Sequence, residues 1–179
     1  MLSAKARYGL KAVLSLALEA QPRAVVGAAL AAREKIPKKF LEQILLELKH
    51  RGLLQTKRGR HGGYLLTRSS SEITVGQIIR ALDGPLAPIA CVSLTAYVKP
   101  CDDCRDETTC GIRLVMKQVR DATARILDNT TLADVARMIA AATTSVEEIV
   151  LALSPGEAKR ASPPGRTVKF RRPRGVLKR

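Results

Sequence analysis

Aromatic side chains and long apolar runs are both scarce in this 179-residue sequence. Three Tyr, two Phe and no Trp make up 3% of the chain. Proteins that bind single-stranded RNA stack its bases on aromatic rings, so RNA is not an expected partner. A membrane-spanning helix needs roughly 18 or more consecutive apolar residues. The sequence has no such run, and we expect neither a transmembrane helix nor a membrane partner.

Acidic residues are scarce as well, and the resulting positive charge is uneven along the chain. The 16 Asp and Glu stand against 31 Lys and Arg, which gives a net charge of +15. The charge is +10 over residues 1–70, −3 over 71–153 and +8 over 154–179. The first basic block is also a patterned segment, which favours double-stranded DNA over acidic lipid as the polyanionic partner. The alternative is a basic surface that is merely solvated.

The rest of the composition is typical of a folded domain. Hydrophobic residues at 46% and charged residues at 26% are close to globular averages. The N-terminus faintly resembles a signal peptide, but its apolar residues follow helical spacing and Glu19 interrupts any cleavage region. We therefore expect a cytoplasmic protein, whose cysteines are metal ligands or sensor thiols rather than a disulfide framework.

The order of the expected elements predicts a winged helix-turn-helix. Three helices are indicated over about residues 3–20, about 25–34, and from Pro37 to just before Gly52; two strands follow over 54–57 and 64–67. Thr74 and Gln77 form a capping box for a further helix that ends at Gly84. The expected fold is mainly α with a small β-hairpin, a winged helix-turn-helix in residues 1–84 followed by a long dimerisation helix.

The part of the chain after residue 84 is expected to connect two protomers. Residues 85–109 form a Cys-containing loop, and residues 110–153 begin with a long helix from about Cys110 to Asp128. Apolar residues recur on that helix at intervals of three and four: Ile112, Val115, Val119, Ala122 and Ile126. This spacing favours a seam for a partner helix in a homodimer. The alternative is that the stripe packs on its own domain.

Two shorter features complete the chain. Thr131 and Asp134 predict the cap of a short helix that runs toward Ala142. Residues 154–179 contain nine basic residues and several prolines without apolar periodicity, so we expect this tail to be disordered.

The third helix is the expected DNA-reading element, because the second helix of such a pair enters the major groove. Lys38 and Lys39 can bind phosphates or guanine, Glu42 can accept from cytosine, and Gln43 can bond adenine. In the wing, Arg60 at the glycine-rich tip suits the minor groove or the adjacent phosphates. For Glu42 and Gln43 the alternative is an ordinary solvated helix face.

The four cysteines form the expected cofactor site. Cys91, Cys101, Cys104 and Cys110 lie within twenty residues in the pattern C-x9-C-x2-C-x5-C. Thiolates of this kind bind iron-sulfur clusters, and four of them also suit zinc. A redox thiol pair or a set of inert structural cysteines would also fit the pattern. Asp102, Asp103, Asp106 and Glu107 outnumber Arg105, and such anions disfavour a reactive thiolate while favouring a bound cation.

The sequence does not indicate an enzyme. A redox Cys-x-x-Cys needs a strand before it and a helix directly after it, whereas this one lies in an acidic loop. No Ser-His-Asp or paired-carboxylate pattern stands out. The remaining rival is a metal-independent basic DNA-binding protein that binds mainly through its tail.

Three motifs resemble the Rrf-two (BadM-like) family of bacterial winged-helix transcription regulators. They are Ser3 to Leu10, Phe40 to Leu45, and Gly62 to Leu66, and the resemblance covers about residues 1–140. It implies a homodimeric regulator, most simply a repressor, and several members hold an iron-sulfur cluster before the dimer helix. It also implies DNA contacts by Ser3, Lys5 and Tyr8, by Glu42 and Gln43, and by Arg58 in the wing.

The cysteine spacing departs from the family pattern. Sensor members typically have three cysteines separated by five residues each, and only Cys104 and Cys110 keep that interval; Val98 stands at the earlier position. The resemblance favours an iron-sulfur cluster, expected as a two-iron two-sulfur type, over zinc. The expected ligands are Cys101, Cys104 and Cys110, with Cys91 as the fourth.

Overall fold

The computed structural model describes residues 2–19, 23–60, 62–97, 99–101 and 104–153. Described residues up to Thr143 form one compact unit, and those from Thr144 to Leu153 belong to a second. The predicted tail, residues 154–179, lies outside the described residues, so its disorder stays a prediction.

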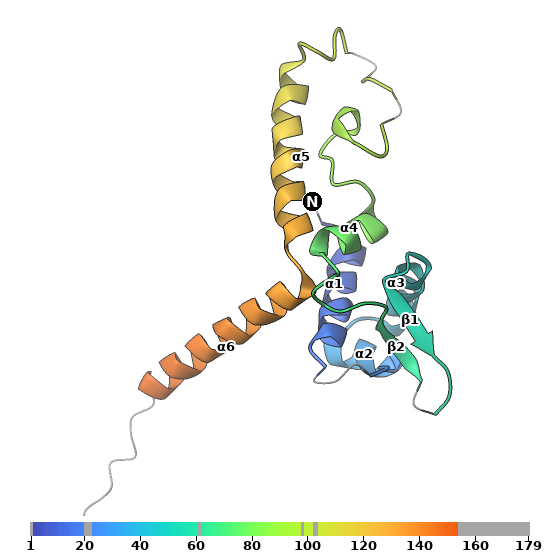
Figure 1. The fold of residues 1–179 in the computed structure, drawn as a ribbon, viewed down its shortest axis with the longest axis vertical. Coiled ribbons are helices and arrows are strands. Elements are labelled where there is room, and N and C mark those ends of the chain that lie inside the picture. Colours follow the sequence, from blue (N-terminus) through green and yellow to red (C-terminus); the bar gives the residue numbers. More distant parts are fainter. Residues whose placement is uncertain (1, 20–22, 61, 98, 102–103, 154–179) are drawn as a thin grey trace, which may run out of the picture. The chain divides into compact units, whose positions relative to one another are not determined.

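The first unit contains the expected winged helix-turn-helix. Its elements are α1 (Ala4–Ala17), α2 (Gly27–Glu34), α3 (Lys38–His50), β1 (Leu54–Lys57), β2 (Gly63–Leu66) and α4 (Val75–Asp83), as Figure 1 shows. Helices α1, α2 and α3 pack on one another, and α4 packs on α1 and α3. The fully buried side chains are aliphatic, as the shortage of aromatics requires: Val13, Leu30, Leu41, Ile44, Leu45, Leu48, Leu54, Ile73, Ile78 and Leu132. The predicted fold class is confirmed.

Local capping explains where these helices begin. The Oγ of Ser3 accepts the N–H of Ala6 at 3.0 Å and starts α1. The capping box at α4 is present in both directions: Gln77 N–H donates to Thr74 Oγ1 at 3.2 Å, and Thr74 N–H donates to Gln77 Oε1 at 3.3 Å. Lys35 adopts a left-handed conformation (φ +54°) and turns the chain directly from α2 into α3.

The wing is an antiparallel hairpin in which Leu54 pairs with Leu66 and Lys57 with Gly63. Val25 and Tyr64 exchange two backbone hydrogen bonds of 2.9 Å, which attach β2 to the segment before α2. Gly63 permits this approach, because its φ is +150° and a Cβ there would lie 2.4 Å from the Val25 carbonyl oxygen.

Beyond α4, the chain forms a short 3₁₀ turn, η1 (Ala90–Val92), and two long helices, α5 (Gly111–Asn129) and α6 (Leu132–Leu153). The Thr131–Asp134 cap is present, with Thr131 N–H donating to Asp134 at 2.8 Å and Asp134 N–H donating to Thr131 at 3.1 Å. The expected end of this helix near Ala142 was wrong, because no Gly or Pro follows until Pro155 and the intervening residues sustain a helix. None of the described helices is long and apolar enough to cross a membrane.

The end of α5 is joined to the winged domain through α4. Val75 N–H donates to the Thr130 carbonyl and Leu132 N–H to the Ile73 carbonyl, both at 2.9 Å. The Arg80 guanidinium donates to both carboxylate oxygens of Asp128, at 2.5 and 2.8 Å. This contact raises the pKa of Arg80 and lowers the pKa of Asp128 below its ordinary 3.8.

We expect the Arg80–Asp128 pair to contribute a small coupling free energy to folding. Both side chains are about two-fifths exposed, so a double-mutant cycle of Arg80→Met and Asp128→Asn should give about 0.5–1 kcal/mol at neutral pH. Because the folded-state pKa of Asp128 is lowered, this stability is present above its ordinary pKa and is lost as pH falls through the folded value. Urea unfolding at several pH values measures it. A coupling that grows on acidification would contradict the assignment.

Candidate DNA interface and cysteine site

Helix α3 presents the predicted DNA-reading residues to solvent. Lys38, Lys39, Glu42 and Gln43 are all exposed, while the opposite face of the helix is buried in the core. Lys38 Nζ lies 3.9 Å from Glu42 Oε1, a loose ion pair at the i, i+4 spacing. These side chains can therefore reach base edges or phosphates without disturbing the core.

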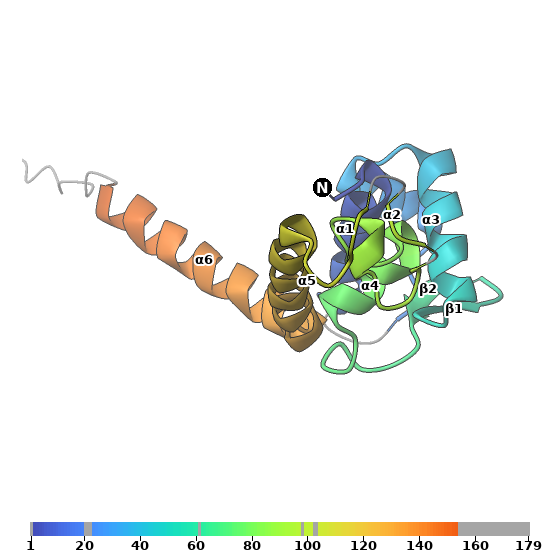
Figure 2. The same ribbon diagram turned by 90° about the horizontal axis from the view of Figure 1, so that it is seen from above.

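The wing adds positive charge beside α3. Helix α3 contacts β1, and Figures 1 and 2 both show the helix and the hairpin side by side. Arg58 and Arg60 at the tip are exposed. Arg60 and Lys57 also line a hollow of about 460 Å³ with Arg23, so three cations surround one concave surface at the wing. Such a surface attracts the DNA backbone.

The three residues expected to bind DNA at the start of α1 all have intramolecular partners. Ser3 N–H donates to Asp83 Oδ2 at 2.9 Å, and the Ser3 hydroxyl donates to Asp83 as well. Lys5 Nζ lies 2.6 Å from Glu47 Oε2 on α3.

Tyr8 completes this set through an aromatic contact. Its ring meets that of Phe40 edge-on, with 5.9 Å between centroids. The start of α1 is thus tied to both α4 and α3. Sequence reasoning missed Arg7, an exposed cation whose guanidinium lies 5.6 Å from the Tyr8 ring centre.

All four cysteines line one cavity of about 380 Å³ at the start of α5. Cys91 is buried on η1, and Cys110 is the residue that precedes the first turn of α5. Cys104 N–H donates to the Cys101 carbonyl at 3.0 Å, which brings the backbones of these two residues together. Residues far apart in the loop are therefore gathered around a single space.

The chemistry of this donor set fits an iron-sulfur cluster or zinc, since both take cysteine thiolates. Within the described ranges, no three His, Cys, Asp or Glu side chains converge closely enough to hold a metal ion. Asp102 and Asp103 lie outside those ranges. The four cysteines therefore fit such a cofactor in two respects: thiolates are the right type of ligand, and all four line one cavity.

Charges of both signs line the described part of the cysteine cavity, Asp106 among them. Asp106 accepts hydrogen bonds from Thr108 and Thr109, which lower its pKa to about 2. Arg105 and Arg113 both line the cavity, so two cations face the cysteines. Counting loop residues alone missed Arg113, because only the packing of α5 brings it there.

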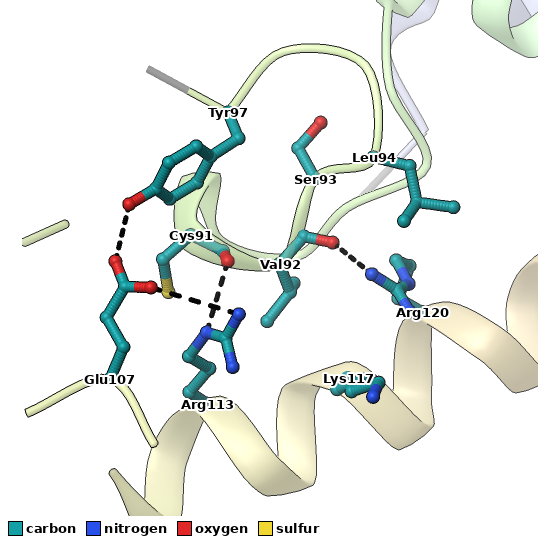
Figure 3. Close-up of a pocket in the computed structure, with 9 residues that line it drawn as sticks. All are labelled: Cys91, Val92, Ser93, Leu94, Tyr97, Glu107, Arg113, Lys117 and Arg120. Atoms are coloured by element: carbon teal, nitrogen blue, oxygen red, sulfur yellow. Dashed lines mark hydrogen bonds and ion pairs between the residues drawn. The ribbon is translucent and has the colours of Figure 1, made fainter. Parts of the chain in front are cut away.

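Arginines of α5 fasten η1 to the helix, as Figure 3 shows. Arg113 Nε donates to the Cys91 carbonyl at 3.4 Å, and Arg120 Nη1 donates to the Val92 carbonyl at 2.5 Å. Glu107 accepts the Tyr97 hydroxyl at 2.5 Å, which raises the pKa of Tyr97, and lies 3.9 Å from Arg113.

The apolar stripe of α5 is exposed. Ile112 is 68% exposed, Val115 54%, Val119 44% and Ile126 65%, and Ala122 is exposed too. The alternative in which this stripe packs on its own domain is therefore wrong.

Comparisons with known proteins place this fold and surface in a family. The model described as "Rrf2: Iron-dependent Transcriptional regulator" matches residues 2–138. A putative HTH-type transcriptional regulator, rrf2-like, of Rhodobacter capsulatus is 42% identical over 137 residues, 75% of this chain and 91% of that protein. IscR of Serratia proteamaculans, an HTH-type transcriptional regulator, is 32% identical over 133 residues, 74% of this chain and 77% of IscR.

Solved structures of transcription regulators resemble this chain as well. The global cysteine regulator CymR of Bacillus subtilis superposes with a TM-score of 0.63 at 32% identity, covering 77% of this chain and 97% of CymR. IscR of T. potens gives 0.61 at 28% identity, covering 78% of this chain and 88% of IscR. The family consists of transcription regulators, which confirms the expectation that the chain is not an enzyme. The chain belongs to the Rrf2 family of helix-turn-helix, DNA-binding transcription regulators.

Proposed function

We propose that the protein is a cytoplasmic, homodimeric transcription repressor whose affinity for its operator is set by a cysteine-ligated iron-sulfur cluster. The observation that supports this most is the gathering of all four cysteines around one cavity at the start of α5. The family model's description as iron-dependent and the similarity to IscR point the same way.

In this proposal the winged domain, residues 1–84, reads the operator. Gln43 and Glu42 on the exposed face of α3 contact base edges, while Lys38 and Lys39 contact phosphates or guanine. Arg58 and Arg60 place the wing on the adjacent backbone or minor groove. Residues 154–179 add charge without sequence preference.

Ser3, Lys5 and Tyr8 contribute a further DNA contact at the start of α1. Ser3 Oγ already accepts the Ala6 N–H, which leaves it one lone pair, and Lys5 keeps its remaining N–H groups; both residues stay at least partly accessible. Tyr8 is half-buried, so its contact with DNA is limited to the exposed part of the ring.

The dimer in this proposal forms along α5. Four large apolar side chains on one face of α5 are each more than two-fifths exposed. Exposure of this apolar stripe to water is unfavourable in free energy. A second copy of the same helix offers the same spacing, and an isologous pairing buries both stripes at once.

Cys101, Cys104 and Cys110, with Cys91, are the proposed ligands of a two-iron two-sulfur cluster. Such a cluster supplies an iron-dependent cross-link between thiolates, with a potential tuned by nearby hydrogen bonds and exposure. The chain's own part is to hold η1 against α5 through Arg113 and Arg120, which fixes the position of Cys91. Residues 85–109 form the cofactor segment and residues 110–153 the dimerisation region.

The cofactor segment connects directly to the DNA-binding surface. It directly follows Gly84, which has a φ of +85° and comes immediately after Asp83. Asp83 in turn holds the backbone N–H and hydroxyl of Ser3, the cap of α1. A change in the segment can therefore alter the start of α1, where DNA contact is proposed.

We predict that Cys104→Ala and Cys110→Ala each abolish cofactor binding, because each removes one thiolate from the proposed ligand set. Anaerobic purification followed by an absorbance spectrum and by iron, sulfide and zinc assays measures this. Thr95→Ala, a substitution of an exposed residue in the same segment, is the control and should keep the cofactor. Full iron and sulfide content in both cysteine variants would show that the ligands lie elsewhere, and zinc without sulfide would identify the other metal.

We further predict that a substitution on α3 and a deletion of residues 154–179 have opposite effects on DNA binding. Gln43→Ala should cost about 1–3 kcal/mol at one operator position while leaving random DNA unaffected. Truncation after Leu153 removes a charge of +8, so it should weaken binding to all sequences and flatten the salt dependence.

Titration of operator and scrambled duplex at two salt concentrations measures both effects. Gln118→Ala, which removes an exposed glutamine from α5, is the matched control for Gln43→Ala. If truncation abolished operator discrimination while Gln43→Ala retained it, the tail rather than α3 would be the reader.

A further inference from the structure

A second cavity, of about 320 Å³, lies between η1 with the residues that follow it and one face of α5. Figure 3 shows Arg113, Lys117 and Arg120 along the helix on one side and the stretch from Cys91 to Leu94 on the other. Tyr97 and Glu107 close one end. Only Cys91 and Arg113 also line the cysteine cavity.

The three cations share one side of α5 because they are spaced by four and three residues. Two of them are held in place by the facing backbone: Arg120 by the Val92 carbonyl and Arg113 by the Cys91 carbonyl. The Arg120 side chain is only 12% exposed. The Lys117 ammonium makes no hydrogen bond or ion pair with any residue that the structure describes.

The charges around this cavity do not balance. Glu107 lies 3.9 Å from Arg113 and accepts the Tyr97 hydroxyl. Arg120 is paired with its neighbour Asp121, whose Oδ1 accepts Nε at 2.8 Å and Nη2 at 2.5 Å. Three positive groups thus face two negative ones, and the unbalanced charge is that of Lys117. A ligand with one negative charge would balance the charge of Lys117.

Most of the remaining lining is apolar, with the hydroxyl-bearing Ser93 as the exception. Val92 is buried beneath the cavity, Leu94 is 81% exposed at its rim, and the Tyr97 ring forms a wall. A ligand that covered Leu94 would bury apolar surface that is otherwise in water. The volume is at the small end of the range for ligand pockets, which suits a small metabolite.

We propose that this cavity binds a small organic monocarboxylate with an apolar body. Lys117 and the guanidinium of Arg113 hold the carboxylate, and Tyr97 and Leu94 cover the apolar part. A planar guanidinium matches a carboxylate well. Glu107 on the same wall disfavours a more highly charged anion such as phosphate.

The cavity lies beside the proposed cluster site and away from the proposed DNA-contacting residues, and binding of a carboxylate there goes beyond the proposed function. It is also connected to the cysteine cavity, because Arg113 and Cys91 line both. A ligand that binds the Arg113 guanidinium would alter the hydrogen bond that this guanidinium donates to the Cys91 carbonyl. Binding of a metabolite at this site can therefore change the position of Cys91 in the cofactor segment.

Calorimetric titration of the full-length protein with phenylacetate and with phenylacetamide tests the proposal, since the two probes share a shape and differ in charge. Phenylacetate should bind with a Kd of about 1 mM or tighter and at least about tenfold more tightly than phenylacetamide. Lys117→Met should weaken phenylacetate binding by about tenfold, a typical effect of losing one charged hydrogen bond. Arg125→Met removes a charge from an exposed residue of the same helix outside the cavity and should have no effect.

Equal binding of the two probes, no saturable binding of phenylacetate, or unchanged binding by Lys117→Met would each overturn the proposal. Inorganic phosphate serves as a third titrant. If phosphate bound more tightly than phenylacetate, the site would be a general anion site and the carboxylate assignment would be wrong. Because no readout uses DNA or iron, these results are independent of the proposed repressor function.

Discussion

The carboxylate of Asp83 accepts both the backbone N–H and the hydroxyl of Ser3, and three parts of the protein meet at this contact. Ser3 caps α1, Asp83 ends α4, and Gly84 links α4 to the segment that contains the cysteines. A carboxylate at the N-terminus of a helix is favoured by the free N–H groups and by the helix dipole. The start of α1 is therefore held by the last residue of α4, one position before the link to residues 85–109.

Different faces of helix α5 carry different side chains and make different contacts. One face is an exposed apolar stripe suited to a second protomer, and another holds η1 through Arg113 and Arg120. Near its end, Asp128 accepts a two-pronged contact from Arg80 on α4. In the proposed function, movement of α5 would reach α4 through Arg80, and movement of residues 85–109 would reach it through Asp83. Helix α4 is the element that both would have to displace.

The sequence was sufficient for the features that depend on neighbouring residues. The capping box of Thr74 and Gln77, the start of α3 at Pro37 and the glycine-rich wing are all encoded within a few positions, and each lies where the pattern predicts. The end of α6 was missed because no Gly or Pro follows Ala142 until Pro155 in the sequence, and the described helix continues to Leu153.

Contacts between distant residues could not be predicted in the same way. Ser3 and Asp83 are 80 positions apart, and no local pattern pairs them. The cysteine spacing indicated a shared site, and the cavity agrees with it, but Arg113 joins that cavity only through the packing of α5. The cationic cavity beside it depends on the same packing, since Lys117 is an ordinary surface residue when the helix is considered alone.

The central claim is that the cofactor segment controls DNA binding through Asp83. Operator affinity of anaerobically purified protein, measured with its cofactor and after the cofactor is removed, tests it in the wild type and in Asp83→Ala. The wild type should show a ratio of affinities in the range of about 5- to 150-fold, as expected for coupled sites. Asp83→Ala with the same iron and sulfide content should give a ratio close to one. An unchanged ratio in that variant would contradict the account.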